Sequence, residues 1–132
     1  MLSFRKETDY AIQFLLYIAK DPDSCHSLKR FANETGISFY FMQKIARKLS
    51  KEGIIQAQQG VCGGYILKAN QKKLTLYDIA CIMEKGVELM ACVDKHHKGC
   101  DNKIKRCKVK KVICNLNMKF VKAMKDVKIL EI

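Results

Sequence analysis

Two short amphipathic segments separated by a glycine-containing turn place the strongest constraint on the fold of this chain. The first segment runs from about residue 27 to 34 and the second from 39 to 51, and each repeats apolar residues at three- and four-residue steps. Between them, Gly36 supports a sharp turn and Ser38 is a preferred N-cap for the second helix. Two helices joined in this way form a helix-turn-helix.

The second of these helices is expected to present a polar and basic face. Its apolar residues, such as Met42 and Ile45, would point toward the core. The side chains left to meet a partner are Ser38, Tyr40, Gln43, Lys44, Arg47 and Lys48. Because glutamine can pair with adenine edges and the basic residues can bind phosphate, this face suits DNA.

A glycine-rich hairpin is expected directly after the helix-turn-helix. The pattern predicts strands over residues 54–59 and 65–67 with a tight turn between them. In that place a hairpin acts as a wing, whose glycines let main-chain N–H groups approach the phosphate backbone. The wing residues expected to contact DNA are Gln59, Gly60 and Gly63.

The flanking sequence predicts two further helices. The first covers residues 8–20, with Thr8 or Asp9 as its N-cap. Its expected buried face consists of Ala11, Ile12, Leu15, Leu16 and Ala19. Residues 75–78, Thr-Leu-Tyr-Asp, form a capping box that opens a helix reaching about residue 85, with Cys81 in its core face.

Three cysteines lie in a polar stretch ahead of the last helix. Cys92, Cys100 and Cys107 are separated by seven and six residues, and the stretch has almost no apolar residues with which to build a core. Thiolate ligation of a metal or an iron–sulfur centre is therefore the leading explanation. The lysines of the same stretch would stabilise thiolates and an anionic cluster.

The C-terminal segment predicts one long amphipathic helix. From Lys108 on, apolar residues recur at three- and four-residue steps as far as Met124, and lysines occupy much of the remaining surface. The apolar stripe needs a partner, either the first helix or the same helix of a second subunit. A symmetric dimer fits a DNA reader, because two half-sites one helical turn apart match its two-fold axis.

Composition limits the class of protein. The chain has 132 residues, 48% of them apolar, which suffices for one domain with a core. Its formal net charge of +12 favours a nucleic-acid partner. We expect no membrane association and a cytoplasmic location, because the chain lacks a run of about 20 apolar residues and its N-terminus is too acidic for a signal peptide. No nucleophile–base pair points to an enzyme.

Taken in order, these motifs resemble one family of bacterial winged-helix transcriptional regulators. This family, of the Rrf-two type, includes IscR, NsrR, RirA and CymR, and the similarity covers nearly the whole chain. The residues that carry it are Leu28, Gly36-Ile37-Ser38, Gly53, Gly60, Gly63-Gly64-Tyr65, Leu74 to Asp78 and the three spaced cysteines.

The resemblance implies a mainly α fold with a small β-hairpin wing. Residues 1–86 would form the winged helix-turn-helix DNA-binding domain, 87–107 the cysteine-bearing cluster loop, and 108–132 the dimerisation helix and tail. The protein would be a homodimeric repressor on double-stranded operator DNA. An iron–sulfur cluster that senses nitric oxide, redox state or iron would control its affinity, with [4Fe–4S] favoured over [2Fe–2S] and the three cysteines as ligands.

Several residues are candidates for a fourth ligand. Lys110 stands where IscR-like members have a histidine. Cys114 would lie about 10 Å along the helix from Cys107 at ~1.5 Å per residue, too far for one small centre. His96–His97 are candidates within the loop. Asp9 is favoured, because its segment Thr-Asp-Tyr-Ala resembles an NsrR-like pattern in which the aspartate reaches the partner subunit's cluster.

Other positions depart from the family pattern and leave alternatives open. Gln59 replaces an arginine that is common in the wing, Gln43 replaces a glutamate that is common in the recognition helix, and the cysteine spacing is wider than in IscR- and NsrR-like members. The alternatives are a cluster-free regulator with a zinc or thiol sensor site, and CymR-like control through a partner protein. An adaptor that binds RNA or protein through the winged helix is a further alternative.

Overall fold

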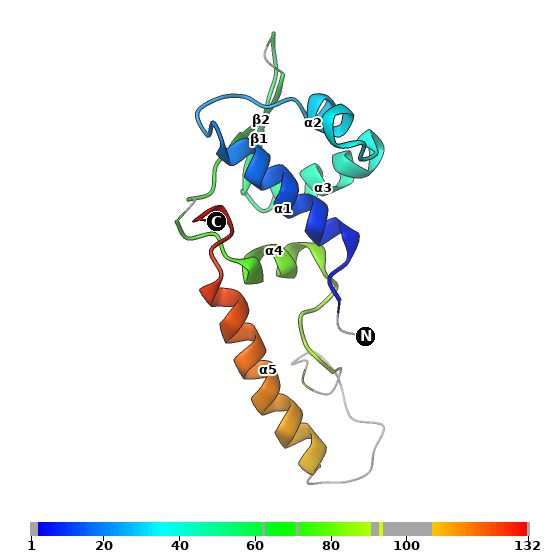
Figure 1. Cartoon of the computed structure of the whole chain (residues 1–132), viewed down its shortest axis with the longest axis vertical. Helices are drawn as coiled ribbons and strands as arrows, with labels where there is room; N and C mark the ends of the chain where they lie inside the picture. Colours follow the sequence, from blue (N-terminus) through cyan, green and yellow to red (C-terminus); the bar gives the residue numbers. More distant parts are fainter. Residues whose placement is uncertain (1–2, 62, 71, 91–92, 94–106, 132) are drawn as a thin grey trace.

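The structure, a computed structural model, describes residues 3–61, 63–70, 72–90, 93 and 107–131. In these parts of the chain, helices surround one core and a two-stranded hairpin projects from one end (Figure 1). The elements are α1 (Lys6–Ala19), α2 (Leu28–Thr35), α3 (Phe39–Lys51), β1 (Ile55–Gln58), β2 (Gly64–Leu67), α4 (Leu76–Met83), α5 (Lys108–Asp126) and a final 3-10 turn, Ile129–Glu131. The mainly α fold with a small hairpin is confirmed.

The helix-turn-helix forms as its sequence predicts, because local signals fix both of its ends. Ser27 accepts a hydrogen bond from the Arg30 N–H at the start of α2, and Ser38 accepts one from the Phe41 N–H at the start of α3. Gly36 closes α2 with φ of 74°, a left-handed conformation that glycine adopts without strain. Helix α3 spans the predicted residues, and its apolar side faces the core as predicted.

The hairpin is held against the segment that leads into α2. Its two strands pair antiparallel from Ile55 opposite Leu67 to Gln58 opposite Gly64. Tyr65 on β2 also exchanges two backbone hydrogen bonds with His26, at 2.9 and 2.8 Å. A Cβ on Gly64 would lie 2.3 Å from the His26 carbonyl oxygen, so this close approach requires glycine. The hairpin therefore keeps a fixed position beside α2 and α3.

Helix α1 crosses the core, and two predictions about it were wrong. It begins at Lys6, two residues before the expected start at residue 8, and its N-cap residue is Arg5 in place of Thr8 or Asp9. Thr8 is fully buried within the helix because its hydroxyl donates to Glu84, which follows α4. The buried face is Ala11, Phe14, Leu15 and Ile18, whereas Ile12, Leu16 and Ala19 are half-buried. Tight packing on α3, α4 and the hairpin sets this rotation.

Helix α4 opens with the predicted capping box. Thr75 accepts a hydrogen bond from the Asp78 N–H, and the Asp78 carboxylate accepts one from the Thr75 N–H. The helix ends at Met83, slightly earlier than predicted. The expectation that Cys81 belongs to the core was wrong: it is exposed, because α4 buries Ile79, Ala80 and Met83 instead.

The end of the chain packs against the start of α4. The Leu76 N–H donates to the Val127 carbonyl at 2.9 Å, and the Ile129 N–H donates to the Leu74 carbonyl at 3.1 Å. Ile129 is buried in the same core as α1. Helix α5 is thus anchored at its C-terminal end, and the rest of it extends away from the core on the side opposite the hairpin (Figure 1). No helix within the described ranges is long and apolar enough to cross a membrane.

Candidate nucleic-acid interface and cysteine site

The outer face of α3 is polar, basic and exposed. Tyr40 is 67% exposed, and the Lys44 ammonium lies 4.8 Å from the centroid of its ring. This cation–π contact holds the lysine on the outer face of the helix. Gln43 and Arg47 are exposed on the same helix, while Met42 and its apolar neighbours fill the core.

A groove runs between α3 and the hairpin. Its volume is about 440 Å³, and it is lined by Gln43, Arg47, Ser50, Lys51, Ala57 and Tyr65. Beyond it, Gln59, Gly60 and Gly63 lie exposed on the wing, where Gly60 has φ of 117° and its carbonyl accepts from the Gly63 N–H. The predicted DNA-facing residues of α3 and of the wing thus lie on neighbouring elements. Cys62, also in the wing segment, lies outside the described residues.

Lys48 differs from the other basic residues of α3 because it has a carboxylate partner. Its ammonium lies 2.7 Å from Glu7 Oε2 on α1. This hydrogen bond lowers the pKa of Glu7; burial opposes it as the second-largest effect, and the charges of Lys48, Arg5 and Lys44 add to the lowering. Lys48 was predicted to face DNA. It is exposed on that surface, and its ammonium is also paired with Glu7 of the same chain.

The cysteine site is only partly within the described residues. Cys107 is the N-cap residue of α5 and is half-buried, whereas Cys92, Cys100 and His96–His97 lie outside the described residues. Among the described residues, no group of three or more histidine, cysteine, aspartate or glutamate side chains could hold a metal ion. The predicted ligand set is therefore a proposal from its donor chemistry.

The surroundings of Cys107 fit a thiolate ligand. The residue precedes the first turn of α5, where backbone N–H groups and the helix dipole favour negative charge. Lys108, Lys110 and Lys111 follow on exposed positions and add positive charge. Cys114, two turns further along, is half-buried. A thiolate-bound anionic cluster or metal at the start of α5 is consistent with these charges.

Asp9, the favoured fourth ligand, lies exposed on α1. Its Oδ1 accepts a hydrogen bond from the Gln13 amide at 3.1 Å, one helical turn away. This carboxylate is open to solvent.

The apolar stripe of α5 is largely uncovered in the single chain. Only Met124 is buried, at the end that packs against α4. Three large apolar side chains of this stripe are between 50% and 66% exposed: Val109, Val112 and Leu116. A stripe of this kind on a projecting helix is typical of a protein–protein contact.

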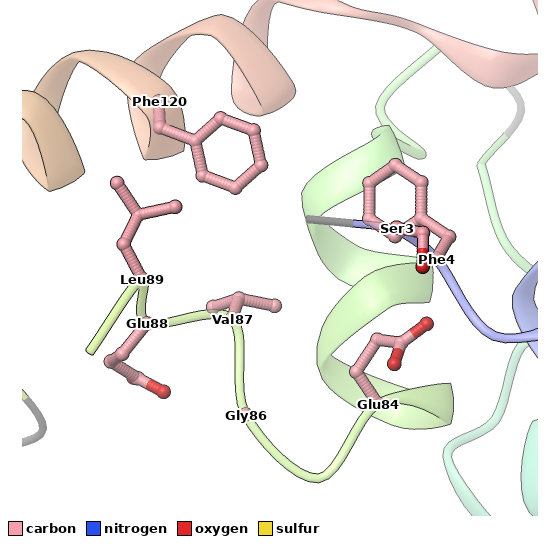
Figure 2. Close-up of a pocket in the computed structure, with 8 residues that line it drawn as sticks. All are labelled: Ser3, Phe4, Glu84, Gly86, Val87, Glu88, Leu89 and Phe120. Carbon is pink, nitrogen blue, oxygen red and sulfur yellow. The ribbon is translucent and has the colours of Figure 1, made fainter. Parts of the chain in front are cut away.

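A cavity of about 270 Å³ lies between the N-terminal segment, the end of α4 and α5. In Figure 2, Phe120 of α5 lies across from Leu89, and Glu84 lies on the side nearest Ser3 and Phe4. The Leu89 N–H donates to Asn117 Oδ1 of α5 at 2.9 Å. The sequence did not predict this bond, and no local motif marks it, because Leu89 and Asn117 are 28 positions apart.

A helix-turn-helix with an exposed basic second helix and a two-stranded wing defines a winged helix-turn-helix transcriptional regulator. The family model Rrf2, described as "Iron-dependent Transcriptional regulator", matches residues 4–132. The chain therefore belongs to the Rrf2 family.

Two curated relatives are HTH-type transcriptional regulators named NsrR. The protein of Halalkalibacterium halodurans is 30% identical over 94 residues, covering 70% of this chain and 64% of the relative. The protein of Shouchella clausii is 29% identical over 94 residues, covering 70% and 63%. The chain thus spans slightly less than two thirds of the length of these relatives.

Two solved structures share the fold. CymR, the global cysteine regulator of B. subtilis, has a TM-score of 0.78 at 16% identity, covering 98% of this chain and 94% of CymR. IscR of T. potens has a TM-score of 0.74 at 19% identity, covering 97% and 83%. At these identities the likeness establishes the overall fold alone.

Proposed function

We propose that this chain is a homodimeric repressor that binds operator DNA and whose DNA affinity is set by an iron–sulfur cluster. The observation that carries the proposal is the exposed basic face of α3 beside the wing, combined with three cysteines that end at the N-terminus of α5. Membership in the Rrf2 family supports the DNA partner and the regulatory role.

In the proposed complex, α3 enters the major groove and the wing follows the phosphate backbone. Lys44 and Arg47 would bind phosphate or guanine edges, Gln43 would pair with adenine, and Tyr40 would hold Lys44 in place. The N–H groups near Gly60 and Gly63 would approach the backbone of the DNA. Ser38, Lys48 and Gln59 complete the proposed surface.

The cluster would be held by Cys92, Cys100 and Cys107, with Asp9 of the partner subunit as the proposed fourth ligand. A [4Fe–4S] cluster is favoured over [2Fe–2S]. When bound, the cluster supplies a centre whose ligation responds to nitric oxide, oxygen or iron shortage. The residues of the chain hold this centre at the start of α5, so a change in ligation would alter the contacts of α5 and the spacing of the two recognition helices.

Anaerobic purification tests the proposal directly. We expect a brown protein with iron and sulfide in equal amounts, whose operator affinity changes at least about fivefold when the cluster is removed, as expected for ordinary coupling between two sites. Equal operator affinity of the loaded and cluster-free forms would contradict the regulatory role. Colourless protein that contains zinc, or a reversible disulfide without metal, would instead support the zinc or thiol sensor.

A further inference from the structure

Glu84 performs a capping role that crosses from α4 to α1. Its Oε1 atom accepts a hydrogen bond from the Arg5 N–H at 2.9 Å and one from the buried Thr8 hydroxyl at 2.5 Å. Helix α1 has no side-chain cap of its own at Arg5. Glu84 directly follows Met83, the last residue of α4. Its carboxylate therefore supplies to α1 the hydrogen-bond acceptor and the negative charge that the start of a helix favours.

From this point, polar contacts continue to the recognition helix. The Arg5 guanidinium donates to the Met83 carbonyl at 3.3 Å and to Glu7 Oε1 at 3.1 Å. The other oxygen of Glu7, Oε2, accepts from the Lys48 ammonium at 2.7 Å. Both oxygens of Glu7 are thus used, one for a cation on each side, and its side chain is only 19% exposed.

In the other direction, the same segment leads toward the cysteines. Glu84 and residues 86–89 line the cavity in Figure 2, and the Leu89 N–H donates to Asn117 of α5. Cys92 follows Leu89 by three positions in the sequence. The segment between α4 and the first cysteine is therefore fastened to α1 at Glu84 and to α5 at Leu89.

We propose that Glu84 and Glu7 form a carboxylate link that positions the recognition helix α3 relative to the segment that enters the cysteine-bearing stretch. The link consists of Glu84, Arg5, Glu7 and Lys48. Displacement of the segment 84–89 releases the start of α1, and Glu7 then no longer holds Lys48. This inference rests on the proposed function for its regulatory meaning, while the physical link can be tested without a cofactor.

The contribution of the link lies in position more than in stability. Ion pairs at the protein surface usually add little to the free energy of unfolding, since solvent screens them. The Glu7 carboxylate is nevertheless held by Arg5 on one side and by Lys48 on the other, and the N–H of Arg5 is bonded to Glu84. These contacts together favour one geometry. A change at Glu84 can therefore reach Lys48 through direct contacts.

Chemical acetylation of the ligand-free full chain tests the physical link. Lys48 is compared with Lys51, which is exposed on the same helix and serves as an internal standard. In Glu7→Ala and in Glu84→Ala we expect Lys48 to react about threefold faster relative to Lys51, the size expected for loss of a partly exposed ion pair. Mass spectrometry of the peptides gives both rates.

The matched control is Glu88→Ala, which removes the same charge from the same cavity without touching α1. If it accelerates Lys48 as much as Glu84→Ala does, the effect acts through space and the link is overturned. The link is also overturned if only Glu7→Ala has an effect. Where circular dichroism shows that Glu84→Ala does not fold, Glu84→Gln and Glu88→Gln form the pair. Glutamine keeps one acceptor but loses the charge, so we expect a smaller acceleration of Lys48 in Glu84→Gln alone, and equal rates in the two variants overturn the link.

The regulatory meaning is tested by operator affinity of the cluster-loaded and cluster-free proteins. We expect the ratio between the two forms to fall at least about threefold in Glu84→Ala and Glu7→Ala and to stay unchanged in Glu88→Ala, within the usual range of coupling between sites. An unchanged ratio in Glu84→Ala would overturn the regulatory role of the link. A wild-type ratio of one would contradict the proposed function instead, and the acetylation result would still decide the link.

Discussion

At the scale of single residues, Arg47 and Lys48 are adjacent cations in different electrostatic situations. Arg47 is exposed and lines the groove beside the wing, whereas Lys48 is bonded to Glu7. We expect Arg47→Met to weaken DNA binding about tenfold and to reduce the slope of affinity against salt by about one. Lys48→Met should cost less than about threefold, because Glu7 already neutralises its charge. Fluorescence anisotropy at several salt concentrations measures both, and equal losses would contradict the distinction.

Cys107 and Cys114 form a matched pair of thiols, one at the N-cap of α5 and one within the helix. Cys107 precedes the helix, while Cys114 lies two turns along it and is half-buried. We expect Cys107→Ser to abolish visible absorbance and bound iron, because serine is a poor replacement for a thiolate ligand. Cys114→Ser should retain the wild-type iron content within about 20%. Iron loss from Cys114→Ser but not from Cys107→Ser would reverse the ligand assignment.

The Glu7 carboxylate gives the stability of the fold a defined dependence on pH. Its pKa in the folded chain is below the ordinary value of 4.5, mainly because Lys48 donates to it. A lowered pKa means that the stabilisation is present above pH 4.5 and is lost as pH falls through the folded value. The melting temperature of the wild type should therefore exceed that of Glu7→Gln at neutral pH, and the gap should close in acid. A gap that does not narrow as the pH falls below 4.5, or one that Lys48→Met leaves intact, would contradict this origin.

At the scale of elements, the apolar stripe of α5 makes the clearest prediction. Leu116 is 50% exposed on the projecting part of the helix. If α5 pairs with its copy, Leu116→Lys places two like charges in the interface, and we expect the protein to become monomeric at micromolar concentration. Lys119→Ala, which removes a solvent-facing charge from the same helix, is the control. Analytical ultracentrifugation gives both masses, and an unchanged dimer in Leu116→Lys would place the interface elsewhere.

The elements also show which parts of the fold a sequence can predict. Helix α3 and the capping box of α4 were predicted correctly, because their signals are local: Ser38 precedes its helix directly, and Thr75 and Asp78 are three residues apart. The start of α1 was not, because Glu84 supplies its cap from 79 positions away. Cys81 was assigned to the wrong face because α4 is short, and its rotation depends on long-range packing.

The candidate site likewise contains features that the sequence predicts and features that it does not. The basic face of α3 follows from helical periodicity, so its exposed residues could be predicted from the sequence. The ion pair between Glu7 and Lys48 could not, because it joins residues 41 positions apart on two helices whose crossing is set by the core. Thiolate ligation by the three cysteines stays a prediction, made from their polar stretch and from the family resemblance.

At the scale of the whole molecule, the C-terminal tail limits how a dimer can read DNA. Val127 and Ile129 are bonded to the start of α4, so α5 leaves the winged helix in a fixed direction. In a dimer built on α5, this anchor would fix the distance between the two α3 helices. Such a dimer needs two half-sites on one face of the duplex, separated by about one helical turn of 10–10.5 base pairs.

The spacing of the half-sites therefore tests the rigidity of the dimer. Inserting about five base pairs between them rotates one half-site to the opposite face of the duplex. We expect affinity to fall to that of a duplex with a single half-site, because only one α3 helix can then enter the major groove. A duplex of equal length with an unchanged site controls for non-specific binding. Unchanged affinity after the insertion would mean that the two winged helices move independently, and that the tail at Val127 and Ile129 does not hold α5 in one direction.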